Sequence, residues 1–171
     1  MKYLRLIKNN SKNLTYLLLD KKKFNCNVGK NGIGLKTREG DLITPKGIYI
    51  LKKVFFRSDR IQRPRTCLSL KKIEKFDYWC VDSKSKNYNM LITKNKKYKS
   101  ENLYRKDSLY DIVIEISFNS FPRKKNKGSA IFIHCSFSDN RKTSGCIALK
   151  KNHLILLLKN LNSKTYIKVQ N

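Results

Sequence analysis

The chain has 171 residues, of which 40% are apolar, 39 are Lys or Arg and 12 are Asp or Glu. This length and apolar content predict one domain over residues 1–171 and exclude an intrinsically disordered chain. The formal net charge of +27 leaves two interpretations open, a compositional bias toward Lys or a surface that attracts an anionic partner such as nucleic acid, a membrane face or a cell-wall polymer.

The N-terminal residues MKYLRLIK contain neither an apolar stretch nor a small-residue cleavage site, so no secretory signal is expected. The longest apolar runs, such as Leu154–Leu158, are too short to span a bilayer. The chain therefore reads as a soluble cytoplasmic protein. A route of export that these residues do not reveal would instead place it in the periplasm or cell envelope.

Periodicity predicts strands over residues 3–8, 14–19 and 24–28, joined by turns into an antiparallel meander. Residues 29–47 contain five of the seven glycines and are expected to form a loop with positive-φ positions. This loop matches neither a P-loop nor a GxGxxG motif, so no phosphate site is predicted there. A strand or a pair of strands follows over residues 48–56.

Two basic segments come next, a loop over residues 57–66 and the acid-free segment 83–100 with six lysines. The second segment favours a solvated insertion loop over a nucleic-acid-binding stripe. The strongest strand patterns lie at 109–118 and 130–134, and a short apolar strand is predicted at 145–149.

The clearest helix is predicted over residues 151–161, and a strand over 165–169 closes the pattern. His153 lies in the first turn of this helix and is interpreted as a surface residue. The five cysteines form no CxxC pair, so no structural zinc site is expected, and Cys26, Cys67 and Cys80 are interpreted as small buried apolar residues. The fold class is mainly β, with one main helix near the C-terminus.

The chemically informative segment is 128–149. His134 ends a predicted strand, and Thr143-Ser144-Gly145-Cys146 follows a polar loop, so that twelve residues separate the imidazole from the thiol. A thiol becomes nucleophilic beside a base that a third group orients, and backbone N–H groups can stabilise the developing oxyanion. A buried cysteine and a hydrogen-bonded core histidine would give the same pattern, so these residues alone leave both interpretations open.

This pattern resembles the L,D-transpeptidase catalytic domain (YkuD-like) family, in which a strand ending in His precedes a Ser/Thr-x-Gly-Cys turn. Glu39-Gly40-Asp41 with Thr44-Pro45-Lys46-Gly47 resembles the family's EGD…TPxG segment. Asp41 and Pro45 also suit a purely structural role, because Asp favours Asx turns and Pro presets turn geometry. The resemblance runs from about residue 28 to the C-terminus and suggests a short, signal-free bacterial branch with an L,D-transpeptidase-like mixed β-sandwich.

The resemblance implies that the Cys146 thiolate attacks an L-to-D peptide bond of a peptidoglycan stem peptide, forms a thioester and releases D-alanine. An amine acceptor, or water in hydrolysis, would resolve the thioester. His134 would act as the base, the Cys135 carbonyl would orient it, and the N–H groups of Ser144, Gly145 and Cys146 would form the oxyanion hole. No metal or organic cofactor is implied, and we expect a monomer that binds donor and acceptor peptides without specific nucleic acid.

The expected substrate contacts are Thr143, Arg38, Tyr110 and Asn119. Loop structuring is the alternative role for Arg38 and Asn119, and core packing is the alternative for Tyr110. The chain departs from the family at Ser144, where a second His is usual, and at Ala148, where Arg or Asn is frequent.

Two other functions stay open from the sequence. One is a cysteine hydrolase or amidase that acts on cell-wall peptides, and the other is a non-catalytic basic β domain that binds anionic polymers. An activated Cys146 is expected to be alkylated faster than the other four thiols.

Overall fold

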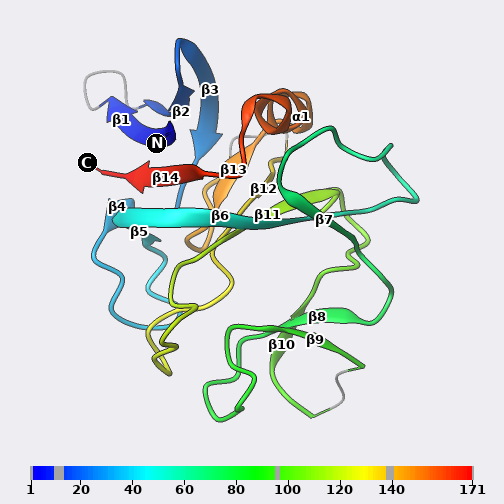
Figure 1. Cartoon of the computed structure of the whole chain (residues 1–171). Coiled ribbons are helices and arrows are strands. Elements are labelled where there is room, and N and C mark those ends of the chain that lie inside the picture. Colours follow the sequence, from blue (N-terminus) through cyan, green and yellow to red (C-terminus); the bar gives the residue numbers. More distant parts are fainter. Residues whose placement is uncertain (1, 10–13, 95–96, 138–140, 171) are drawn as a thin grey trace.

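The structure, a computed structural model, describes residues 2–9, 14–94, 97–137 and 141–170. Three antiparallel strands near the N-terminus form the predicted meander (Figure 1). They are β1 (Lys2–Asn9), β2 (Leu14–Leu19) and β3 (Lys22–Asn27). Successive strand residues point to opposite faces, so Leu4 and Leu6 of β1 are fully buried between more exposed neighbours.

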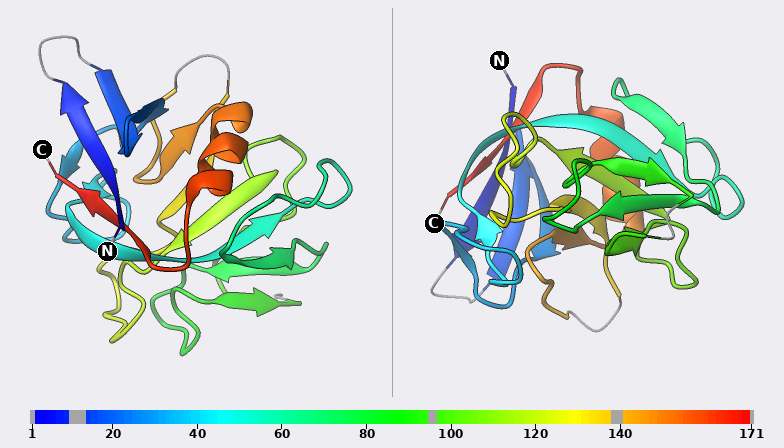
Figure 2. Two further views of the ribbon diagram at one scale, coloured as in Figure 1. Left: turned by 45° about the horizontal axis from the view of Figure 1, so that its top comes forward. Right: turned by 90° about the horizontal axis from the view of Figure 1, so that it is seen from below.

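The meander belongs to a nine-stranded mixed sheet with the order β11-β12-β13-β3-β2-β1-β14-β6-β7. Its other strands are β6 (Gly47–Phe56), β7 (Ser69–Lys72), β11 (Ile112–Ile116), β12 (Phe132–Cys135), β13 (Ile147–Leu149) and β14 (Thr165–Val169). Strand β6 pairs with β14 through its first half and with β11 through its second half. The sheet therefore curls back on itself around the core (Figure 2), and the mainly β class is confirmed.

Three of the predicted strands are shorter in the structure, and the strand predicted over 145–149 keeps only the residues of β13, 147–149. Strand β11 occupies the middle of the predicted range 109–118, because the residues before Ile112 form a turn. The predicted strand 130–134 begins only at Phe132, because Ala130 has a φ of +51°, which an extended strand does not accommodate. Conversely, residues 48–56 form part of one continuous strand.

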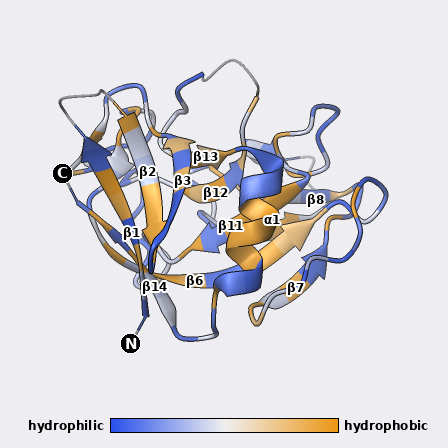
Figure 3. Ribbon diagram, turned by 90° about the horizontal axis from the view of Figure 1, so that it is seen from above, coloured by the Kyte–Doolittle hydropathy of each residue, from blue (hydrophilic) through white to orange (hydrophobic). Residues whose placement is uncertain are grey.

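The core inside the curled sheet is closed by the predicted helix, α1 (Lys151–Asn160). Leu154, Leu157 and Leu158 are fully buried, and Figure 3 shows the apolar face of α1 above β11 and β12. The helix ends one residue before the predicted end, because Leu161 has extended backbone angles. Among the described residues, no helix is long and apolar enough to cross a membrane.

Two small sheets lie outside the main one. Strands β4 (Ile33–Gly34) and β5 (Thr44–Pro45) pair within the predicted glycine-rich loop, and β8 (Asp77–Cys80) pairs with β9 (Leu91–Thr93) and β10 (Ser100–Asn102). The interpretation of 83–100 as a simple insertion loop was therefore wrong in its described part. The three residues of β9 are too few for a period-2 pattern to stand out among the lysines, although Tyr88 in the same segment is 2% exposed.

Candidate active site

The fold brings the predicted nucleophile and base to the same cavity. Strands β12 and β13 are parallel neighbours, and His134 on β12 is in register with Ala148 on β13. Cys146 comes directly before β13. Both His134 and Cys146 line a cavity of about 810 Å³, so the fold brings the two residues to one site.

The His134 ring is oriented by its own strand. Its Nδ1 lies 2.7 Å from the carbonyl oxygen of Cys135. A carbonyl only accepts, so in the neutral ring Nδ1 carries the proton and Nε2 keeps a lone pair for use as a base. The Tyr110 ring packs edge-on against the imidazole, with ring centroids 5.4 Å apart. Burial lowers the pKa of His134 to about 4, so the ring is neutral at pH 7.

The Cys146 thiol is buried and hydrogen-bonded to backbone groups. Its Sγ–H donates to the Ala130 carbonyl at 3.1 Å, and Sγ accepts the Phe132 N–H at 3.4 Å. Burial raises the pKa of Cys146 to about 12, and the charge of Glu101 acts in the same direction. The free protein therefore holds a thiol where the resemblance implies a thiolate, and the nucleophile must lose its proton during the reaction.

The turn before Cys146 is locked by one threonine. The Thr143 hydroxyl donates to the Cys146 carbonyl at 2.6 Å and accepts the Gly145 N–H at 3.1 Å. Gly145 has a φ of +139°, and a Cβ there would lie 2.9 Å from the Ile43 carbonyl oxygen, so only glycine fits without strain. The Gly145 N–H is thus already engaged, and in the described part of the chain the N–H groups of Ser144 and Cys146 stay without an acceptor.

Asp41 of the EGD segment holds its own loop together through one ion pair and three backbone hydrogen bonds. The Asp41 carboxylate accepts hydrogen bonds from the Lys36 ammonium at 2.5 Å and from the backbone N–H groups of Thr37, Arg38 and Ile43. Burial by itself raises the pKa of Asp41, but these donors outweigh it and hold the pKa below its ordinary value. This bonding supports the structural role suggested by the sequence.

The β5 threonine links this segment to the nucleophile turn. The Thr44 hydroxyl donates to the Gly145 carbonyl at 2.9 Å and accepts the Gly29 N–H at 2.9 Å. Thr143 in turn pairs with Gly29 in an isolated parallel bridge. The glycine-rich segment and the Thr143–Cys146 turn are therefore one bonded unit.

A buried asparagine, Asn89, fixes the position of Ala130, the residue whose carbonyl binds the thiol. Asn89 Oδ1 accepts the Ala130 N–H at 3.0 Å and the Trp79 Nε1–H at 2.9 Å. Its Nδ2 donates to the carbonyls of Phe118 and Asn119 at 3.1 and 2.8 Å. Asn89 thus ties three chain segments together at the back of the cavity.

The four expected substrate contacts separate into two groups. Thr143 and Tyr110 line the cavity, together with the departure positions Ser144 and Ala148. Arg38 is exposed and does not line it, and its backbone N–H caps Asp41.

Asn119 also lies outside the cavity lining. Its amide donates to the carbonyls of Lys124 and Gly128 at 2.9 and 2.8 Å and accepts the Lys124 N–H at 2.8 Å. The geometry of Arg38 and Asn119 therefore favours the loop-structuring alternative over substrate contact.

Several lining residues were not anticipated from the sequence. Many of them are charged: Lys30, Lys36, Lys99, Arg105, Arg141 and Lys142 are basic, and Glu39 and Glu101 are acidic. The excess of cations favours an anionic substrate such as a peptide carboxylate. One sequence pattern could have indicated Glu101, because it is the first acid after the acid-free segment 83–100.

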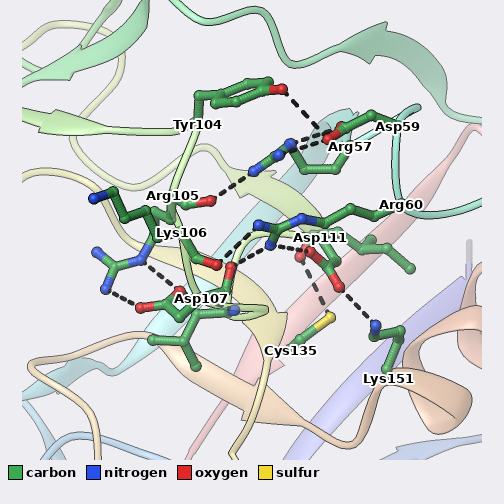
Figure 4. A network of polar contacts seen from close by, with 12 residues as sticks. Arg57, Asp59, Arg60, Tyr104, Arg105, Lys106, Asp107, Asp111, Cys135 and Lys151 are labelled. Atoms are coloured by element: carbon green, nitrogen blue, oxygen red, sulfur yellow. Dashed lines mark hydrogen bonds and ion pairs between the residues drawn. The ribbon is translucent and has the colours of Figure 1, made fainter.

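Two arginines hold the segment that carries Arg105 (Figure 4). Arg57 donates to the Arg105 carbonyl at 2.6 Å. Arg60 donates to the carbonyls of Lys106 and Asp107 at 2.8 and 2.6 Å. Three consecutive carbonyls are thus bound by guanidinium groups, which fixes this wall of the cavity.

The same network reaches the strand that carries the base. The buried Asp111 carboxylate pairs with Arg60 at 3.1 Å and with Lys151 of α1 at 2.6 Å (Figure 4). The Leu109 carbonyl accepts the Cys135 N–H at 3.0 Å. The wall and β12 are therefore held in one relative position.

The resting geometry reverses the expected order of thiol reactivity. Cys26 and Cys80 are buried as predicted, but Cys67 is exposed, so its interpretation as a buried residue was wrong. In the free protein, Cys67 is expected to react with iodoacetamide at pH 7 faster than Cys146, whose thiol is buried, hydrogen-bonded and protonated. Peptide mapping after timed labelling measures both rates. A Cys67→Ser variant is expected to remove the fast phase, and fastest labelling of Cys146 in the wild type would contradict this prediction.

Comparison with known proteins gives one match. A family model described as YkuD, L,D-transpeptidase catalytic domain, matches residues 3–169. No curated protein and no solved structure matches the chain.

Proposed function

The chain belongs to the L,D-transpeptidase catalytic domain (YkuD) family, and from its site we propose that it is a cysteine acyltransferase acting on peptidoglycan stem peptides. Cys146 is the proposed nucleophile and His134 the proposed base. One observation carries the proposal: the two residues line one cavity, and Nδ1 of His134 is engaged by the Cys135 carbonyl, which leaves Nε2 for the thiol proton.

In this proposal the reaction starts from the neutral pair of thiol and imidazole. As the donor peptide binds, the thiol leaves the Ala130 carbonyl and gives its proton to His134, while Sγ attacks the scissile carbonyl. The N–H groups of Ser144 and Cys146 stabilise the oxyanion. Collapse of the tetrahedral intermediate breaks the C–N bond, and the imidazolium protonates the departing D-alanine amine.

The second half of the reaction transfers the acyl group to an amine. The acceptor attacks the thioester, the C–S bond breaks, and Sγ recovers its proton. The basic lining of the cavity supports a substrate with carboxylates, because Lys30, Lys99 and Lys142 present positive charge to it. The proposed chemistry uses no metal or organic cofactor.

Mass spectrometry of the intact protein tests this function. Wild-type protein mixed with a stem tetrapeptide is expected to gain the mass of the peptide minus D-alanine, while Cys146→Ala gains none. A second control, Cys67→Ser, removes the exposed thiol and is expected to form the adduct normally. Absence of both the adduct and D-alanine release from the wild type would refute the proposed function. The alternative of a non-catalytic basic domain that binds anionic polymers would then be favoured.

A further inference from the structure

The acidic side chain Glu101 lies beside the candidate nucleophile. Glu101 is on β10 and lines the same cavity as Cys146 and His134. Its carboxylate accepts a hydrogen bond from the Tyr110 hydroxyl. The Tyr110 ring contacts His134, so one side chain connects the carboxylate to the base. The charge of Glu101 also helps to raise the pKa of the Cys146 thiol, after the larger effect of burial.

Most of the charged side chains that line the cavity are basic, so the Glu101 carboxylate differs from its surroundings in the sign of its charge. Among the described residues, six basic side chains line the cavity; Lys36 and Arg105 are paired with Asp41 and Asp107, and the other four leave the cavity net positive, which repels an ammonium group. Two carboxylates of the described residues line the cavity, and of these Glu39 is held by the Tyr88 hydroxyl at 2.5 Å and the Ser129 hydroxyl at 3.0 Å. Glu101 accepts from Tyr110 and forms no salt bridge with a described cation, so it keeps lone pairs that can face the cavity.

The acceptor amine must lose a proton before it can attack the thioester, and Glu101 can accept that proton. At neutral pH the amine is protonated, and an ammonium cannot attack a thioester because it has no lone pair. It must both enter a cationic cavity and lose one proton there. Burial raises the pKa of Glu101, while the Tyr110 hydrogen bond and the charge of Arg105 oppose this effect. A carboxylate with a raised pKa is a better proton acceptor near neutral pH than an exposed one.

We infer that Glu101 forms the subsite for the acceptor ammonium and removes its proton before the amine attacks the Cys146 thioester. The Glu101 carboxylate takes one proton from the ammonium. The freed lone pair forms the new C–N bond, the C–S bond breaks with its electrons going to Sγ, and the second amine proton passes to Sγ through His134. Tyr110 is a positioning residue that holds Glu101 in place. This inference rests on the proposed function.

The test separates the two halves of the reaction. A 4-nitrophenyl ester of the stem tripeptide acylates the protein without any need to protonate the leaving group, and release of nitrophenolate reports acylation. Two acceptors are then compared, labelled D-alanine, which is an ammonium at pH 7, and hydroxylamine, which is largely neutral. For Glu101→Gln we expect aminolysis by D-alanine to fall roughly 100-fold, the lower end of what a positioned base contributes. Nitrophenolate release is expected not to fall, because loss of the Glu101 charge removes one cause of the raised Cys146 pKa, and the reaction with hydroxylamine is expected not to fall either.

Glu39→Gln is the matched control, because it removes the same charge from the same cavity at the other carboxylate. It is expected to change aminolysis by D-alanine only a few-fold, and Tyr110→Phe is expected to fall between the two variants. Equal losses with both acceptors, an unchanged rate with D-alanine, or equal effects of Glu39→Gln and Glu101→Gln would overturn the inference. Absence of nitrophenolate release from wild type would instead overturn the proposed function, and this inference with it.

Discussion

Replacing His134 with glutamine is expected to lower the rate constant for acylation by about 10²–10⁴-fold, the contribution of a positioned general base. Cys146 begins as a thiol whose pKa is raised to about 12 by burial, so almost no thiolate is present at pH 7 without a proton acceptor. Nε2 of His134 is the lone pair that the Cys135 carbonyl leaves available. Stopped-flow measurement of nitrophenolate release from the activated ester gives the rate constant directly.

The chain offers a matched control for this substitution. His153, the other histidine, lies on α1 against the Phe24 ring, with centroids 6.1 Å apart. His153→Gln is expected to leave the acylation rate constant unchanged. If both variants acylate at the wild-type rate, His134 is not the base.

The pH dependence of acylation follows from the burial of His134. Because its pKa is lowered to about 4, the neutral ring is present at pH 7 and persists well below the ordinary titration range of histidine. Acylation measured as kcat/KM is expected to stay constant as the pH falls from 7 and to drop only toward about 4. The unfolded chain binds this proton at a higher pH, so stability also declines as the pH falls below about 6.5.

Replacing Asp41 with alanine is expected to lower the free energy of unfolding by about 3–5 kcal/mol, the usual cost of removing one partner of a buried ion pair. The side chains of Lys36 and Asp41 are 2% and 7% exposed, so the remaining ammonium would have no solvent to replace its partner. Three backbone N–H groups would also lose their acceptor. Urea unfolding followed by tryptophan fluorescence measures the change.

The exposed pair Lys2–Asp20 provides the comparison for this substitution. Its side chains are 28% and 66% exposed, and water screens their attraction. Asp20→Asn is expected to change the free energy of unfolding by less than about 1 kcal/mol. A similar loss of unfolding free energy in both variants would mean that burial does not make the Lys36–Asp41 pair more stabilising than the exposed pair. Because the pKa of Asp41 is lowered in the folded state, its contribution is present near neutral pH and is lost as the pH falls through that pKa.

The parts of this protein that follow local rules were predictable from its sequence. Alternating apolar residues located β1, β2 and β14, and the 3.6-residue period located α1 to within one residue. The spacing of His134 and Cys146 in the chain, with a strand on each side, indicated that the two residues share one site, and both line the same cavity. These features depend on neighbours within a few residues or on one short connection.

The parts that depend on distant contacts were not predictable. Glu101 enters the cavity because β8, β9 and β10 form their own sheet, and the strands concerned are only three or four residues long. Ala130 interrupts a predicted strand because Asn89, far away in the chain, fixes its N–H. Protonation of Cys146 likewise follows from burial, which one residue and its neighbours do not reveal.

The position of β14 in the sheet has a consequence for synthesis of the protein on the ribosome. Residues 165–169 lie between β1 and β6, where they join two strands that are both translated well before them. Until these five residues have emerged, both neighbours lack a partner on one side and expose unpaired backbone groups. The main sheet is therefore complete only after nearly every other element has been translated. Until then its unpaired strand edges can cause aggregation, from which the nascent chain must be protected.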